Sequence, residues 1–396
     1  MAMRQDATAT WDDRFPALDA MRGVAALMVV VLHASRMLAG QWVPGGYLAV
    51  DLFFALSGFV IAHAYDRRLA DGLPGGRFLL MRALRFWPLY ALGVALGLVH
   101  QLMLVATHNP HAMPLASLSI AATLQLAFLP GALAGGAGNL FPLNAPSWSL
   151  FLELMVNAAF GLCFAYLTRA RLIAVAAAAV PFLILAAFHA GTLDLGATTA
   201  TLSGGMARML YAFAMGILIH RGGWHLPALP LPILLALVVA ALAAPVPGGW
   251  RPVYDTAFAL IGSPLLVAFG ATSRPVAGET RAAEWLGLIS YPVYAIHRPL
   301  IDLATPIAEG LHLPVILRAL ALLGGLAVAA VLLDRLYDRP LRKTLARLTT
   351  RRPERAVPEI ARPAASPARL RRSPRTAPVA VRAGRVGRRG PATVSA

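Results

Sequence analysis

Long apolar blocks separated by short polar segments fill the sequence from residue 23 to residue 334. Most blocks run for about 20 residues, which is enough for a helix to cross roughly 30 Å of hydrocarbon. This pattern predicts an all-α polytopic membrane protein with about ten transmembrane helices. The predicted spans are 23–39, 47–65, 86–106, 148–167, 172–189, 206–220, 227–246, 253–271, 285–303 and 313–334, and the apolar stretch at 117–131 is ambiguous.

The positions of arginine indicate how the chain is oriented, because arginine near the ends of spans collects on the cytoplasmic side. With the N-terminus inside, the outside loops hold only Arg251. This arrangement requires that 117–131 does not cross, so we predict that 107–147, rich in Pro and Gly, is an external and partly re-entrant segment. Four arginines fall inside spans near their outer ends and must pair with acids or extend outward: Arg36, Arg208, Arg298 and Arg318.

Both ends of the chain differ in composition from the apolar blocks. We predict a cytoplasmic N-terminal segment at 1–20 with no cleaved signal peptide, a membrane domain at 21–340, and a disordered cytoplasmic tail at 341–396. The whole chain is 58% apolar and 13% charged, which argues against an ordinary soluble protein. Much of its net charge of +17 comes from the tail, which could bind anionic lipid headgroups or merely aid solubility and topology.

Several kinds of chemistry lack support in the sequence. The single cysteine, Cys163, lies in an apolar block, so an intrachain disulfide is impossible. No phosphate-binding loop, dinucleotide-binding glycine motif or metal-spaced His/Cys cluster is present. We therefore expect no metal and no nucleic-acid partner, and we predict no oligomeric state.

The first span carries Arg22 and His33 on one face of a helix. The two residues are eleven positions apart, which in a helix is a rotation of about 20° beyond three full turns and a rise of roughly 16 Å. A cation would thus stand at the cytoplasmic mouth, with a titratable imidazole near mid-membrane that could exchange a proton. The alternative is a histidine that only hydrogen-bonds a neighbouring helix and an arginine that only extends to the surface.

The second and third spans add polar residues of both charges. Asp51 is an intramembrane carboxylate that needs a partner, and Gly58 would allow close helix packing, with Ser57 beside it. Arg82 and Arg85 enter the third span from inside. Together with Arg22 they could form a basic collar for a phosphorylated donor, although positive-inside topology alone would also produce it.

The fourth and ninth spans each present a row of polar side chains. Directly after Trp148, the residues Ser149, Glu153 and Asn157 are spaced four apart and so share one helix face. A buried acid such as Glu153 is either a structural partner of a basic residue or part of a reaction centre. Ser290, Tyr294 and His297 lie within about 60° of one another and could line an outward-facing vestibule or merely pack helices. Histidine, carboxylate, hydroxyl and arginine together suit acyl transfer to an alcohol.

Five segments in order resemble the acyltransferase-3 family of bacterial membrane O-acyltransferases. They are Leu18-Asp19-Ala20-Met21-Arg22 with His33, Asp51 to Phe59, Arg85 to Tyr90, Trp148 to Glu153, and Ser290 to Pro299. The resemblance covers about 14–340. It implies an acyl-CoA donor, an acceptor hydroxyl on a carbohydrate or glycoconjugate, and an essential pair formed by Arg22 and His33.

We therefore predict a multi-pass O-acyltransferase of the bacterial inner membrane, with both termini cytoplasmic and acetyl-CoA as the favoured donor. His33 would be a general base or a transient acyl carrier. The remaining assignments are catalytic for Arg22 and Glu153, donor-binding for Arg22, Arg82 and Arg85, and substrate-binding for Asp51, Trp148, Ser149, Tyr294 and His297. A glycoconjugate transporter or exporter is the alternative, although we find no internal repeat. A second and weaker alternative is a membrane scaffold that recruits partners through the tail.

Overall fold

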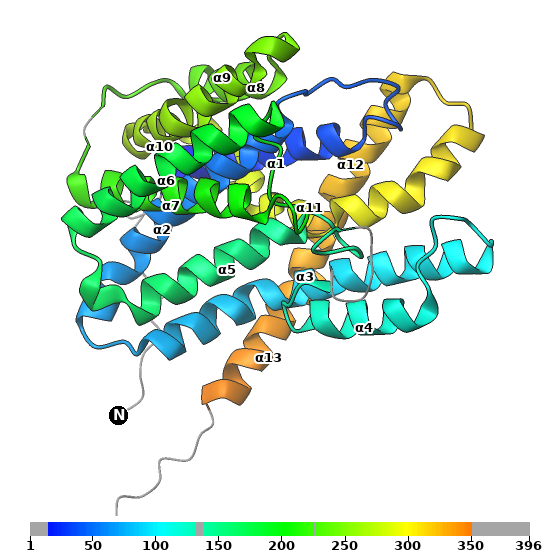
Figure 1. Ribbon diagram of the computed structural model, residues 1–396, viewed down its shortest axis with the longest axis horizontal. Helices are drawn as coiled ribbons and strands as arrows, with labels where there is room; N and C mark the ends of the chain where they lie inside the picture. The colour runs from blue at the N-terminus through cyan, green and yellow to red at the C-terminus, as the bar shows by residue number, and fades with distance from the viewer. Residues whose placement is uncertain (1–14, 132–137, 225, 351–396) are drawn as a thin grey trace, which may run out of the picture. The chain divides into compact units, whose positions relative to one another are not determined.

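A computed structural model describes residues 15–131, 138–224 and 226–350 (Figure 1). Apart from one isolated bridge between Asn139 and Thr198, their regular structure is helical. The helices are α1 (Pro16–His33), α2 (Ala49–Ala70), α3 (Gly75–Ala106), α4 (Leu115–Leu126), α5 (Ser147–Leu162), α6 (Arg169–Ala190), α7 (Leu202–Gly222), α8 (Leu231–Ala243), α9 (Arg251–Ala257), α10 (Ser263–Thr272), α11 (Ala277–Gly310), α12 (Val315–Leu333) and α13 (Arg339–Thr350).

Seven segments of the described chain are long and apolar enough to cross a membrane: Pro16–His33, Gly46–Ala70, Gly75–Ala106, Arg169–Ala190, Leu202–Gly222, Gly248–Thr272 and Val315–Arg347. The predicted all-α membrane fold is confirmed. The predicted spans 148–167 and 227–246 correspond to the shorter helices α5 and α8, of 16 and 13 residues. The predicted span 285–303 lies within α11, which has 34 residues and carries much of the polar chemistry. The count of ten crossings stays a prediction.

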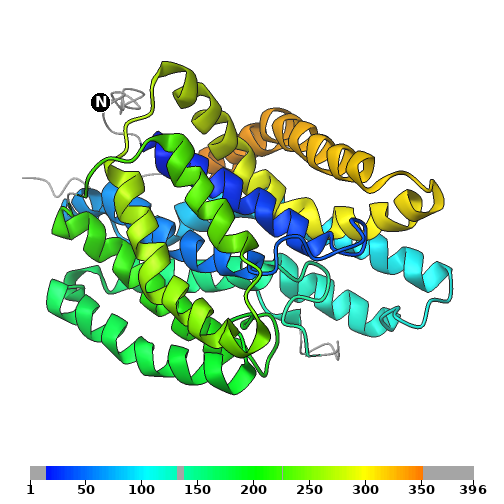
Figure 2. The same cartoon turned by 90° about the horizontal axis from the view of Figure 1, so that it is seen from above.

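Helix α1 lies at the centre of the packing (Figure 2). It runs alongside α11 and also contacts α2, α8 and α10. Glycine permits the close approach to α11, because a Cβ at Gly23 would come within 2.6 Å of Leu286, and one at Gly287 within 2.7 Å of Asp19. Helix α7 packs on α2 and α6, and α3 joins α11 to α5 and α4.

Helix α1 begins and ends earlier than the predicted span 23–39. It starts with Pro16 in the first turn, where a missing N–H costs nothing, and it ends at His33. The chain continues through turns in which Ala39 has a φ of 52°. His33 is therefore the last residue of its helix and lies beside the middle part of α11.

The first ten residues of the predicted disordered tail, 341–350, are helical in the structure. A π-helical turn, Asp334–Asp338, joins α12 to α13, so that helix continues past residue 340. Two ion pairs hold this junction, between Arg339 and Asp334 at 2.6 Å and between Arg342 and Asp338 at 2.7 Å. The rest of the predicted tail, 351–396, and the segment 1–14 lie outside the described residues.

Candidate active site

A cavity of about 290 Å³ lies between α1, α2, α3, α5 and α11. We call it the central cavity. Its polar side chains are three arginines, one carboxylate and five hydroxyls, and the rest of its wall is mainly aliphatic and aromatic. It is lined by Arg22, Ala26, Val50, Phe53, Phe54, Leu56, Ser57, Val60, Ile61, Arg82, Arg85, Phe86, Ser149, Leu150, Glu153, Ser290, Tyr291 and Tyr294.

Arg22 is fixed in the central cavity by groups on two helices. Its Nε donates to Ser290 Oγ at 3.0 Å, and its Nη2 donates to Asp19 Oδ1 at 2.8 Å and to the carbonyl of Gly287 at 3.3 Å. The side chain remains 37% exposed. Arg22 is therefore oriented by the protein and still reachable by a ligand.

Glu153 is the carboxylate of the central cavity, and it faces α2 and α3. Ser57 donates a 2.7 Å hydrogen bond to its Oε1, and Arg82 Nη2 lies 3.5 Å from the same oxygen. Glu153 and Arg82 are each 17% exposed. The sequence left the partner of Glu153 open, and the structure shows that it is Arg82, with Ser57 as a second contact.

Arg85 links the central cavity to the C-terminal end of the membrane domain. Its Nη1 lies 3.5 Å from Asp338, and its guanidinium lies over the ring of Tyr291, 5.6 Å from the centroid. Tyr291 donates a short hydrogen bond to the carbonyl of Phe86. Arg85 is 42% exposed and so keeps an accessible edge. Sequence reasoning missed Tyr291 and Asp338, although Asp338 precedes Arg342 by one helical turn.

Ser149 and Tyr294 meet at the wall of the central cavity. Their hydroxyl oxygens lie 2.5 Å apart, so one donates to the other, and the carbonyl of Pro146 lies 3.0 Å from the Ser149 hydroxyl and 3.3 Å from that of Tyr294. Phe53 contacts the Tyr294 ring edge-on, with centroids 5.5 Å apart. These two residues from different predicted motifs are therefore brought together as a hydroxyl pair.

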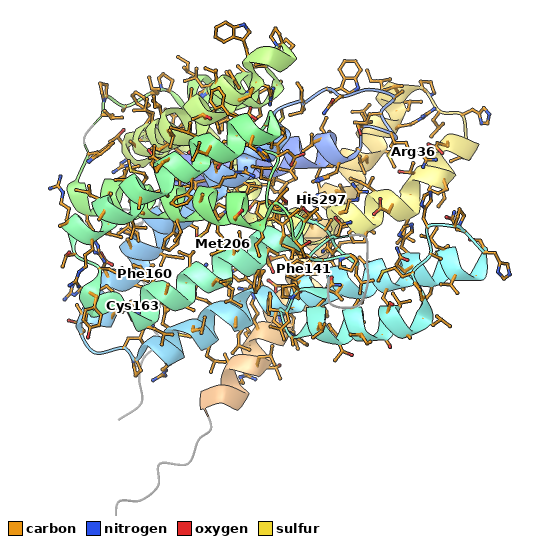
Figure 3. All side chains as sticks on the ribbon, in the orientation of Figure 1. Arg36, Phe141, Phe160, Cys163, Met206 and His297 are labelled. Carbon is orange, nitrogen blue, oxygen red and sulfur yellow. The ribbon has the colours of Figure 1, made fainter. Side chains whose placement is uncertain are left out.

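His33 and His297 lie next to each other, further along α1 and α11 than the central cavity. His33 Nδ1 is 3.1 Å from His297 Nε2. His297, labelled in Figure 3, is fully buried within the bundle. His33 is half-buried. Neither histidine is among the residues that line the central cavity, and His297 is enclosed by the α1–α11 contact. A substrate held in the central cavity would not touch His297, and the substrate contact expected for this residue stays a prediction.

Asp51 and Trp148 also lie outside the central cavity. Asp51 is fully buried against Arg208, which donates to its two carboxylate oxygens at 3.0 and 2.6 Å. Trp148 lies against Gly196, with the Arg208 guanidinium 5.8 Å from its ring. These contacts give Asp51 and Trp148 structural roles, and they leave no surface on Asp51 for a substrate.

The other arginines placed inside predicted spans also find partners. Arg298 pairs with Asp302 at 3.1 Å, and Arg318 donates to the carbonyls of Leu313 and Met37. Arg36 donates two hydrogen bonds to Glu309, which lower the pKa of that exposed carboxyl. Together with the Asp51–Arg208 pair, these contacts confirm acid partners for three of the four arginines, whereas Arg318 contacts backbone carbonyls.

The central cavity combines three arginines, a carboxylate and an apolar wall, and the His33 imidazole lies further along α1. These groups suit the transfer of an activated acyl group. A family model described as an acyltransferase domain matches residues 15–334. The chain belongs to this acyltransferase family. The match includes the five motif segments noted in the sequence and extends to Asp334 at the end of α12.

Three relatives show what this acyltransferase is similar to, and two of them are named for acyl transfer. It is 39% identical over 183 residues to "Protein 2 in picA locus" of Rhizobium radiobacter, covering 44% of this chain and 95% of that protein. It is 27% identical over 303 residues to a Komagataeibacter xylinus protein named as a membrane-bound transacylase, covering 72% and 73% of the two chains. A Staphylococcus aureus protein named as an O-acetyltransferase is 41% identical over 46 residues, which cover 12% of this chain and 7% of that protein. No solved structure matches the chain.

Proposed function

We propose that this membrane acyltransferase moves an acetyl or other short acyl group from acyl-CoA to a hydroxyl of a carbohydrate or glycoconjugate. The observation that carries the proposal is the central cavity, where Arg22, Arg82 and Arg85 converge with Glu153. His33 lies further along α1, the helix that carries Arg22. Acetyl-CoA is the donor that we favour. Membership of the family makes the chain an enzyme, which favours acyl transfer over the transporter and scaffold alternatives.

The charge of the central cavity favours an anionic donor. Three guanidinium groups line it, and of their carboxylate partners Asp19, Glu153 and Asp338 only Glu153 lines it too. The surface that a ligand meets is therefore mainly cationic. Arginine binds phosphate oxygens in pairs through its planar fork. Apolar residues such as Phe53, Val60 and Phe86 line the same space. A donor with phosphates at one end and an uncharged thioester arm at the other matches both kinds of surface.

We propose that donor and protein meet on the cytoplasmic side of a bacterial inner membrane. The positive-inside rule places the segment containing Arg67, Arg68, Arg77, Arg82 and Arg85 in the cytoplasm, together with both termini. Arg22 and Arg85 are each about two-fifths exposed, so the cationic end of the central cavity is the accessible one. Acyl-CoA made in the cytosol would then enter at these arginines.

The proposed chemistry uses His33 as the general base. Its imidazole removes the proton from the acceptor hydroxyl while that oxygen attacks the thioester carbonyl. The carbon–sulfur bond breaks, the ester forms, and the CoA thiolate leaves and takes up the proton from His33. Glu153, at the other end of the site, would accept a hydrogen bond from the acceptor and orient it, while its charge offsets that of Arg82.

A carbohydrate acceptor is supported by the resemblance to bacterial O-acyltransferases and by the O-acetyltransferase name of a relative. The test is mass spectrometry of cell-surface glycans and secreted small molecules from cells with the protein, without it, and with His33→Ala. We expect an acyl ester, 42 Da heavier than the parent for acetyl, only in cells with the intact protein. Identical spectra in all three strains would contradict the proposed function.

A further inference from the structure

The buried histidine His297 has a geometry that the proposed function does not use. Its Nδ1 lies 2.8 Å from the carbonyl of Tyr294 and 3.2 Å from that of Val293. A carbonyl oxygen only accepts hydrogen bonds, so Nδ1 must carry the proton. In neutral His297 the lone pair is therefore on Nε2, the atom that faces His33.

The same argument fixes the proton on His33. Its Nδ1 lies 3.1 Å from the lone pair of His297 Nε2 and 3.0 Å from the carbonyl of Val29. Both neighbours are acceptors, so His33 Nδ1 must donate. The unprotonated nitrogen of neutral His33 is then Nε2, which is the atom a general base needs.

From this geometry we infer that His297 is a positioning residue, which holds His33 with its Nε2 free to accept a proton. This inference rests on the proposed function in one respect, namely that the group giving its proton to His33 is the acceptor hydroxyl. His297 is fully buried among apolar residues that include Val293, Ile296 and Val30, so it acts through His33. A carboxylate or carbonyl commonly orients a catalytic or metal-binding histidine. Here the imidazole of His297 has that role.

The His33–His297 contact also bears on the step after proton transfer. When the acceptor hydroxyl gives its proton to His33 Nε2, the ring becomes an imidazolium with a proton on each nitrogen. The Nδ1–H then donates to neutral His297 as a charge-assisted hydrogen bond, which is stronger than the neutral one. The proton on Nε2 passes to the leaving thiolate, and both rings return to their starting state.

The Val29 carbonyl offers a simpler account, since it could hold the His33 tautomer by itself. The two accounts differ when His297 loses its acceptor nitrogen. His297→Phe keeps an aromatic ring without an acceptor, and His297→Leu is a second such variant in case the first folds poorly. His297→Gln returns an acceptor oxygen near the position of Nε2. Replacing the exposed His189 by Leu is the matched control.

The first readout needs no acyl transfer. Diethyl pyrocarbonate modifies the unprotonated nitrogen of a neutral imidazole, and mass spectrometry gives the rate at His33 relative to exposed His108. We expect the His33 rate to fall about tenfold or more in His297→Phe and His297→Leu and to recover largely in His297→Gln. Equal rates in the wild type and both apolar variants would overturn the inference in favour of Val29.

The second readout is acetyl-CoA turnover by membranes of the protein's own host, which hold the natural acceptor. We expect kcat to fall about 10- to 100-fold in His297→Phe, with the KM for acetyl-CoA unchanged and with partial rescue by His297→Gln. An unchanged kcat would overturn the inference. If wild-type membranes transfer no acyl group while His33 labelling still depends on His297, the positioning role stands and the proposed function fails.

Discussion

Arg208 donates two hydrogen bonds to the Asp51 carboxylate, of 3.0 and 2.6 Å, and neither side chain is exposed by more than 1%. The same guanidinium also donates to the carbonyls of Leu195 and Tyr47. It thereby joins α2 and α7 to the loop that follows α6.

We therefore expect Asp51→Asn to reduce stability by about 3 to 5 kcal/mol, because it leaves the Arg208 charge buried without a counter-charge. Thermal unfolding in detergent measures this loss. The double variant Asp51→Leu with Arg208→Met is the control and should regain most of the stability. If Asp51→Asn is as stable as the wild type but has a higher KM for the acceptor, Asp51 contacts substrate after all.

The close contact between α1 and α11 should be sensitive to a single methyl group. A Cβ at Gly287 would lie 2.7 Å from the Cβ of Asp19, the residue that holds Arg22. We expect Gly287→Ala to cost about 1 to 3 kcal/mol in thermal unfolding and to reduce activity further by displacing Arg22. Gly324→Ala in α12 meets nothing within 4 Å and is the control. Equal melting of both variants would show that α1 does not pack this closely.

Glu153→Gln separates the catalytic role of Glu153 from a structural one. The amide keeps an oxygen for the Ser57 hydrogen bond but removes the charge that faces Arg82. We expect kcat to fall about tenfold or more, with no loss of donor affinity because the central cavity becomes more positive. Ser57→Ala keeps the carboxylate and should change kcat much less. Steady-state kinetics on folded protein would refute the catalytic role if Glu153→Gln kept its kcat and lost only stability.

Arg22 and Arg85 should not tolerate lysine if they bind the phosphates of the donor. Lysine keeps the charge but lacks the planar fork, so each change should weaken acyl-CoA binding by about 1.5 to 3 kcal/mol, or roughly ten- to a hundredfold. Arg77→Lys, an exposed position of α3 outside the central cavity, is the control. Acyl-CoA titration of purified protein measures the effect. If the curves of all three lysine variants match that of the wild type, Arg22 and Arg85 serve only to set the membrane topology.

The part of the site that sequence could predict is the part that lies within one helix. Helical periodicity put Arg22 and His33 on the same face of α1, and both face α11, where Arg22 contacts Ser290 and His33 contacts His297. Likewise, the apolar blocks indicated the helical membrane fold. These features depend on neighbours a few residues away, which the sequence displays directly.

Contacts between distant helices could not be predicted in the same way. His297 shares a face with Ser290 and Tyr294, but α1 covers that face one turn beyond the central cavity and leaves His297 buried. The end of α1 at His33 was missed because the apolar run continues into turns after it. The partner of Asp51 lies 157 residues further along the chain, so only the packing of α2 against α7 reveals it.

The central claim is that His33 performs acyl transfer at the α1–α11 contact. Its most direct test is acetyl-CoA turnover by host membranes containing equal amounts of folded wild type and His33→Ala. His33 is the only imidazole in α1, so we expect the alanine variant to lose at least about 99% of turnover while its melting temperature stays close to that of the wild type. Turnover by His33→Ala at the wild-type rate would contradict the account.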